Sequence, residues 1–328
     1  MVKEHLSVSL KQLLSLYAII PVMLAAVWLD RMAFGGLLKQ ALPFRPETWI
    51  WWVYLFGMPH VVASMNTLID REYLSFYRWK LAYVFAACLA LPYALAWLAG
   101  PHAIFVAFAA FIIYHTVAQQ FGITIVAMRR KPGTLFRVWK WSAVGAALAL
   151  YAMLYTLPVP LVFVEDSPLR DMLTSAAQIL LVCHVGAGIA LAWSVRGNRL
   201  GISHIAANTL LISAEFYFFQ QGYFVLVVLL ARVIHEFTAW HIYATHDSNR
   251  ARSGAHNLLF RALAFTRAPV YLLSIALAFA IGIALTYGLL RFDTAGMLVI
   301  SLSFIHYWME GFLWKGGSIH RRNLAFVS

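Results

Sequence analysis

The run APVYLLSIALAFAIGIALTYGLL (residues 268–290) decides the fold class, because it contains no charged residue. A helix crosses the hydrocarbon core of a bilayer with about 20 apolar residues, and this run is long enough. The composition of the chain agrees, since 62% of its 328 residues are hydrophobic and 12% are charged, whereas about 25% of residues are charged in a soluble domain. We therefore expect an integral membrane protein.

Similar apolar runs recur along the whole chain. Ten segments are expected to span the membrane: 12–33, 47–69, 79–99, 102–128, 138–158, 172–195, 203–219, 221–246, 268–290 and 293–314. The connections between them are short, with no linker and no low-complexity tract. The predicted fold class is therefore all-α, a polytopic transmembrane helix bundle of about ten spans, in which residues 1–328 form a single integral membrane domain.

The basic residues predict the orientation of the chain. Most of the 25 Lys and Arg residues fall in the N-terminus, the even-numbered loops and the C-terminus, as cytoplasmic segments do under the positive-inside rule. Both termini are therefore expected in the cytoplasm. This alternation also accounts for the net charge of +12, so no nucleic-acid partner is expected.

Histidines form the main functional pattern. Five of them lie about 12–14 residues from the predicted outer ends of their spans: His60, His115, His184, His235 and His306. A single histidine inside a span most often bonds to a neighbouring helix. Five at one depth instead favour a metal site, because neutral imidazole is the commonest protein metal ligand and facing helices can offer one nitrogen each.

Polar residues accompany these histidines at helical spacing. One follows four positions after each of three histidines, on the same helical face: Ser64, Gln119 and Glu310. Such groups orient ligating imidazoles or relay protons. Charged residues inside spans are costly and suggest function, so Glu236, beside His235, is a further candidate. Arg232 could neutralise Glu236 or pair with Glu215, and a purely structural ion pair is the alternative for each charge.

The segment ARVIHEFTAWHIYATHD (231–247) carries three histidines on one predicted helix. His235 has the depth of the predicted metal site. His241 is six residues further on and points about 120° away, so it could join only through a bulge or kink, or act as a proton relay. His246, followed by Asp247, is expected at a cytoplasmic helix end.

Four short motifs together resemble a known family. They are FGMPH ending at His60, FIIYH ending at His115, IHEFTAWH with its paired histidines, and IHYWMEGF at His306. In order and location they resemble the Brp/Blh-type bacterial carotenoid cleavage enzymes. That resemblance implies a multispanning protein of a bacterial cell (inner) membrane that holds a catalytic iron by histidines and splits β-carotene with O₂ into retinal.

The residues and the resemblance lead to one functional hypothesis. Imidazole ligands suit iron, copper or zinc, and O₂ and apolar molecules reach a site at this depth most readily. We therefore expect an oxidoreductase, a non-haem iron (Fe²⁺) oxygenase that acts with O₂ on an apolar lipid or isoprenoid-like substrate. The predicted metal ligands are His60, His115, His235 and His306, with His241 as a further candidate. The residues expected to orient ligands or relay protons are Gln119, Glu236 and Glu310.

Two alternatives remain open. A haem-binding oxidoreductase needs only two axial histidines on facing helices. A proton-coupled transporter would use the histidine, glutamate and arginine residues as a relay. Membrane desaturases and hydroxylases also use histidine clusters, but the sequence lacks their HxxxH and HxxHH boxes.

Overall fold

The structure is a computed structural model that describes residues 5–43, 54–156, 168–254, 257–289 and 295–328. It is 84% helical, which confirms the predicted all-α class. Within the described residues, seven helical segments are long and apolar enough to cross a membrane. These helices are compatible with an integral membrane protein.

The chain divides into two compact units, each built from separate stretches of sequence. The first unit comprises Met1–Ser9, Ile50–Phe111 and Glu236–Val327, and the second comprises Leu10–Trp49, Ile112–His235 and Ser328. Two of the points where the chain passes from one unit to the other lie inside helices, in α7 (Pro101–Met128) and in α11 (Phe224–Ser253). This agrees with the absence of a linker in the sequence.

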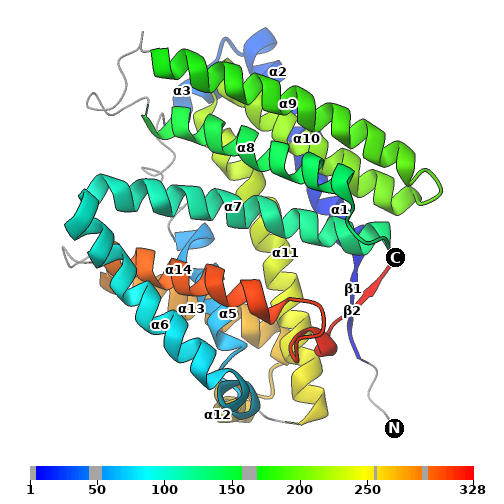
Figure 1. Cartoon of the computed structure of the whole chain (residues 1–328). Helices are drawn as coiled ribbons and strands as arrows, with labels where there is room; N and C mark the ends of the chain where they lie inside the picture. The colour runs from blue at the N-terminus through cyan, green and yellow to red at the C-terminus, as the bar shows by residue number, and fades with distance from the viewer. Residues whose placement is uncertain (1–4, 44–53, 157–167, 255–256, 290–294) are drawn as a thin grey trace. The chain divides into compact units, whose positions relative to one another are not determined.

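Within the described residues, the first unit has four main helices besides its parts of α7 and α11. They are α5 (Met58–Asn66), α6 (Arg71–Ala99), α13 (Val270–Leu289) and α14 (Ala295–Leu313) (Figure 1). Shorter elements are α12 (Leu258–Ala262), η3 (Ala264–Thr266) and η4 (Arg321–Asn323). α5 packs against α13 and α14, and α14 packs against α6. A parallel strand pair, β1 (Ser7–Ser9) and β2 (Ala325–Val327), joins the two ends of this unit's sequence.

Small residues allow α5, α11 and α13 to approach closely. Ala63, Ala239 and Ala278 lie in one buried cluster with Trp240 and Tyr243. In membranes, helix association depends on such close packing, because lipid is as apolar as the side chains. The start of α6 is fixed by Asp70, whose side chain accepts hydrogen bonds from the first backbone amides of that helix.

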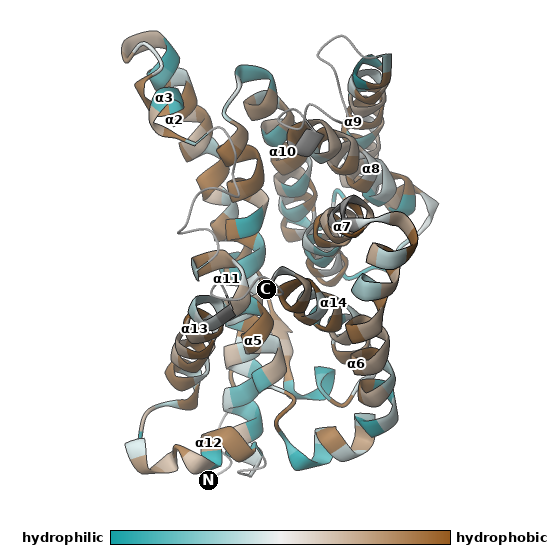
Figure 2. Cartoon of the chain, turned by 90° about the vertical axis from the view of Figure 1, so that its left-hand side faces the viewer, coloured by the Kyte–Doolittle hydropathy of each residue, from teal (hydrophilic) through white to brown (hydrophobic). Residues whose placement is uncertain are grey.

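The second unit contains α1 (Leu10–Ser15), η1 (Leu16–Ala18), α2 (Ile19–Ala33), α3 (Leu37–Ala41), α8 (Thr134–Thr156), α9 (Pro168–Ser194) and α10 (Arg199–Gln221). α9 packs against both α8 and α10, and α10 also contacts α1 and α2. Hydrophobic residues colour much of the length of these helices in Figure 2. On α9, for example, Ile179, Val182 and Ile189 are exposed, and exposed apolar side chains of this kind are what contact with lipid requires.

Each of the ten predicted spans overlaps a described helix, but not every helix is a typical span. In segment 47–69 the described helix is α5, of nine residues, and residues 44–53 lie outside the described part of the chain. α10 is long, but it buries His204, Asn208 and Glu215 along its length, and it is not among the seven apolar segments. The count of ten spans and the cytoplasmic location of the termini stay predictions.

Candidate metal centre

Close packing of α5 on α13 fixes the position of His60. A Cβ atom added at Gly282 in α13 would lie 2.5 Å from the backbone nitrogen of Pro59 and 2.6 Å from its Cα. No larger residue fits without moving one helix. Pro59 also stands in the first turn of α5, where its fixed φ suits a helix start. Gly282 therefore fixes the position of Pro59 and, with it, of His60, the buried residue that follows Pro59 in α5.

His60, His306 and Glu310 bring three possible ligand atoms together within the first unit. Each residue offers one atom within 4.8 Å of the others, and the rings of His60 and His306 lie edge to face with centroids 4.5 Å apart. All three are buried. Ligand atoms around one ion, with bonds of about 2.1 Å, lie about 3 to 4.2 Å apart. This buried group could hold a metal ion.

A serine hydroxyl orients the ring of His306. Ser64 Oγ donates a hydrogen bond to the carbonyl of Val61 at 2.7 Å and lies 2.7 Å from Nδ1 of His306. A hydroxyl has one proton, and the carbonyl of Val61 can only accept. Nδ1 of His306 therefore donates to Ser64, so Nε2 is the ring nitrogen that carries the lone pair, as a metal-binding nitrogen does. The helical spacing in the sequence predicted that Ser64 would orient His60. In the structure Ser64 bonds to His306 instead.

A carboxylate lies beside Nδ1 of His60. Glu236 Oε2 lies 2.9 Å from Nδ1 of His60, and both side chains are buried. A carboxylate there favours a proton on Nδ1, so Nε2 becomes the ligating atom. Metal-binding histidines usually donate their second N–H to a carboxylate, a carbonyl or water. Glu236, predicted to orient ligands or relay protons, has the position for the first of these roles.

The charges of this group favour a cation. Glu236 and Glu310 are 0% and 8% exposed, and the two carboxylates repel one another. Carboxylate oxygens also ligate divalent metal ions. A divalent ion bound beside two neutral imidazoles would offset both negative charges.

Two further histidines of the predicted layer lie against each other in the second unit. The rings of His115 and His235 are buried and lie edge to face with centroids 4.9 Å apart. The structure therefore brings the predicted ligands together within each unit, as His60 with His306 and as His115 with His235.

His184, also in the predicted layer, has a structural environment. Its Nδ1 lies 2.9 Å from the carbonyl of Trp139, and its ring stacks on that indole at 5.5 Å. The carbonyl only accepts, so this nitrogen carries the proton. The backbone bond and the stacking on Trp139 account for the buried position of His184.

His241 was a candidate ligand, and the structure places it beside a tyrosine. Its Nδ1 lies 2.7 Å from the hydroxyl of Tyr271. Among the described residues, His241 is not one of those whose ligand atoms lie close enough together to share a metal ion.

Gln119 was predicted to orient a ligand or relay protons. It is half-buried, and its Oε1 lies 3.5 Å from Nε2 of Gln120. Its proposed action on His115 stays a prediction.

The predicted pairing of Glu215 with Arg232 is wrong. Glu215 is 0% exposed, and within the described parts of the chain neither of its carboxylate oxygens has a hydrogen-bond partner.

Sequence reasoning missed a buried network around His246 in the first unit. His246 Nδ1 lies 3.1 Å from Asp247 Oδ1, Nε2 lies 3.1 Å from the hydroxyl of Tyr73, and Ser274 donates to Asp247 at 2.6 Å. His246 and Asp247 are 0% and 2% exposed, and α11 continues to Ser253, so the helix end expected at these residues is wrong. The helical pattern gave no sign that residues of α6 and α13 cover this position.

His320 completes this network and lies outside the apolar spans. It is fully buried, stacks on His246 at 5.1 Å and lies 3.8 Å from the ring of Tyr73. Burial, and then the charges of His246 and Arg250, lower the pKa of His320 far below its usual 6.5. No signal in the sequence distinguished this histidine from others in the loops and tail.

The chain matches no protein-family model, no curated protein and no solved structure. Its function is therefore argued from the candidate metal centre.

Proposed function

We propose that this protein is a membrane-embedded non-haem iron oxygenase that uses O₂ to oxidise an apolar, isoprenoid-like substrate. One observation carries the proposal. Two buried histidines have Nδ1 directed to other side chains, and both offer a ligand atom close to one from Glu310. Two histidines and one carboxylate with open positions form the ligand set of non-haem Fe(II) oxygenases.

Each residue of the chain has a definite role in this proposal. His60 and His306 supply neutral nitrogen ligands and Glu310 supplies an anionic oxygen. Glu236 favours a proton on Nδ1 of His60, and Ser64 accepts a hydrogen bond from Nδ1–H of His306. Bound iron(II) would supply the capacity to activate O₂. The burial of all these groups keeps bulk water away and favours apolar reactants.

His115 and His235 enter the proposal as further ligands because of their predicted depth. They share the layer of His60 and His306 in the sequence, and they face each other in the second unit. Measuring the metal content of His115→Ala and His235→Ala variants decides whether they belong to the same ligand set.

The haem alternative fits the two ring pairs poorly. Two imidazoles that bind one haem iron from opposite faces, with bonds of about 2 Å, have centroids about 6 Å apart. The centroids are 4.5 Å apart for His60 and His306 and 4.9 Å apart for His115 and His235, and both pairs are edge to face. Neither pair has room for a porphyrin between its rings.

The alternation of basic residues supports a finer topology for the proposal. It favours ten spans and both termini in the cytoplasm, while the inner membrane of a bacterium is what the resemblance to the Brp/Blh-type enzymes implies. Single cysteines placed at 250 and at 171, with Cys88 and Cys183 replaced, test it by labelling from either side of the membrane. The proposal expects position 250 to react from the cytoplasmic side and position 171 from the opposite side.

The activity is tested by oxygen consumption of iron-loaded protein in detergent, with β-carotene as the first probe and an isoprenoid alcohol as the second. We expect substrate-dependent O₂ uptake that is lost in Glu310→Gln and kept in His241→Ala. Equal uptake by the Glu310→Gln variant contradicts the proposal. Proton transport by metal-free protein in vesicles would support the transporter instead.

A further inference from the structure

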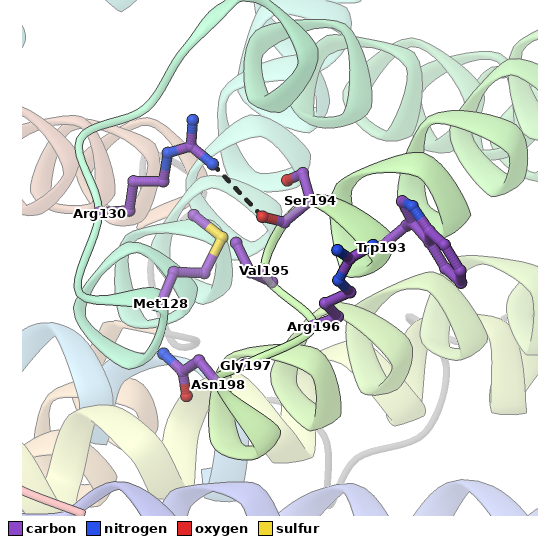
Figure 3. Close-up of a pocket in the computed structure, with 8 residues that line it drawn as sticks. All are labelled: Met128, Arg130, Trp193, Ser194, Val195, Arg196, Gly197 and Asn198. Atoms are coloured by element: carbon purple, nitrogen blue, oxygen red, sulfur yellow. Dashed lines mark hydrogen bonds between the residues drawn. The ribbon is translucent and has the colours of Figure 1, made fainter.

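A cavity of about 510 Å³ lies at one end of the second unit (Figure 3). One wall comes from the residues that end and follow α7, Met128 and Arg130. The other comes from residues 193–198, where α9 ends and the chain turns into α10. The cavity is separate from all the histidines described above.

The cavity is strongly basic. Arg130 and Arg196 both line it, and Arg130 Nη1 donates to the carbonyl of Ser194 at 3.5 Å (Figure 3). The sequence has no Asp or Glu between residues 72 and 165 or between 171 and 215, and both walls fall in these stretches. A guanidinium has five N–H donors, so each arginine keeps donors for an anionic ligand.

Hydrogen bonds hold the two walls in place. Asn198 Nδ2 donates to the carbonyl of Ala127 at 2.8 Å, and Asn198 Oδ1 accepts from the amide of Gly201 at 3.0 Å. This side chain therefore ties the α9–α10 connection to the end of α7. Val195, in the second wall, is buried. The site is built into the fold before any ligand arrives.

An exposed apolar stripe on α9 leads to this cavity. Ile179, Val182, Ile189 and Trp193 are 64%, 72%, 67% and 70% exposed, and their spacing puts them on one face of the helix. α9 is one of the helices apolar enough to span a membrane. Arg196 lies 5.2 Å over the ring of Trp193, so the stripe ends where the basic cavity begins.

We propose that this cavity binds the headgroup of an anionic phospholipid whose acyl chains lie along α9. The basic cavity fits the phosphate, and the apolar stripe fits the chains. Tryptophan is favoured at the level of lipid headgroups, and basic pockets between membrane helices bind anionic headgroups. The same phosphate chemistry occurs in free phosphate, but free phosphate would leave the apolar stripe without a role.

The test is native mass spectrometry of the full chain in detergent, titrated with phosphatidylglycerol or phosphatidylcholine. The variant is Arg130→Gln with Arg196→Gln. The matched control is Arg71→Gln with Arg78→Gln, which removes the same charge. Arg78 also lies over a tryptophan, Trp79, at 5.5 Å, but these residues are not among those that line the cavity.

We expect phosphatidylglycerol to bind in preference to phosphatidylcholine. The cavity variant should weaken it about 30-fold, because each basic residue near an anionic headgroup contributes about fivefold, and the control should change it little. If the double variant does not fold, each single variant should weaken binding about fivefold. Equal binding of the two lipids overturns the proposal, as does equal weakening in the control. Inorganic phosphate that competes fully at the affinity of the lipid also overturns it, because the acyl chains would then contribute nothing.

Discussion

The two units both bury histidines, but they surround them with different partners. In the second unit, His184 and His204 each place one ring nitrogen on a backbone carbonyl, that of Trp139 and that of Leu10. In the first unit, His60 and His306 place Nδ1 on side chains and offer ligand atoms near Glu310. Burial alone therefore does not identify a metal ligand, whereas a ring nitrogen that lies close to ligand atoms of other residues marks a candidate.

The largest expected effect comes from removing a ligand in the first unit. His306→Ala or Glu310→Gln should lower the affinity for Fe²⁺ or Co²⁺ more than about 100-fold, because even residues that only orient ligands contribute 10- to 100-fold. A metal titration of purified protein measures this. The matched control is His184→Ala, which removes an equally buried histidine of the second unit and should keep the affinity. Loss of metal affinity in His184→Ala as well would contradict the proposed difference between the histidines of the two units.

A smaller effect is expected from replacing Glu236, which lies beside Nδ1 of His60, or Ser64, which lies beside Nδ1 of His306. Glu236→Gln should weaken metal binding about 10- to 100-fold, and Ser64→Ala about tenfold, because each leaves the ligating ring less well oriented. The same titration measures both, with circular dichroism to check that the helices form. If affinity is unchanged in both variants, the assignment of Nε2 as the ligating atom is wrong.

The close approach of α13 to α5 should matter for both stability and metal binding. Gly282→Ala forces a Cβ against the backbone of Pro59, and overpacking of this kind costs about 1–3 kcal/mol. Thermal unfolding in detergent should show the loss, and the metal titration should show weaker binding. Gly288→Ala is the control in the same helix, because a Cβ there meets no atom within 4 Å. Equal effects of the two substitutions would show that α13 does not position His60.

The smallest effect concerns pH and the His246 network. The folded state holds the pKa of His320 far below 6.5, so the unfolded chain binds the proton first as the pH falls. The contribution of His320 to stability is therefore complete above pH 6.5 and falls by about 1 kcal/mol per pH unit below it. Unfolding at pH 7.5 and 5.5 should show less acid destabilisation in His320→Gln than in the natural chain. His246, Arg250 and Tyr73 face His320 and are unchanged in both proteins, so an equal acid effect in the two would refute this assignment.

Much of the fold can be predicted from the sequence because the lipid bilayer restricts which backbone structures can cross it. Backbone groups in a bilayer must bond within a helix, so uncharged runs such as 268–290 predict helices directly, and α13 (Val270–Leu289) confirms this one. The division into two units within α7 and α11 has no such signal, because it depends on which helices pack together.

The candidate site was predictable in part for a related reason. Periodicity along one helix correctly grouped His306 with Glu310, one turn apart. It assigned Ser64 to His60 because both lie on α5, while the actual partner, His306, comes from α14. Contacts between helices depend on their packing, and periodicity within one helix does not contain that information. The same limit explains the wrong pairing of Glu215 and the missed position of His320.

The most direct test of the account is iron X-ray absorption, with elemental analysis, on protein purified in detergent without chelator. We predict nearly stoichiometric iron bound only by nitrogen and oxygen, with outer-shell scattering from at least two imidazoles and no haem absorption band. In the His306→Ala variant this iron should be absent. Purified protein that retains no iron, or that holds it as haem or through sulfur, would contradict the assignment of His60, His306 and Glu310 as a non-haem iron centre.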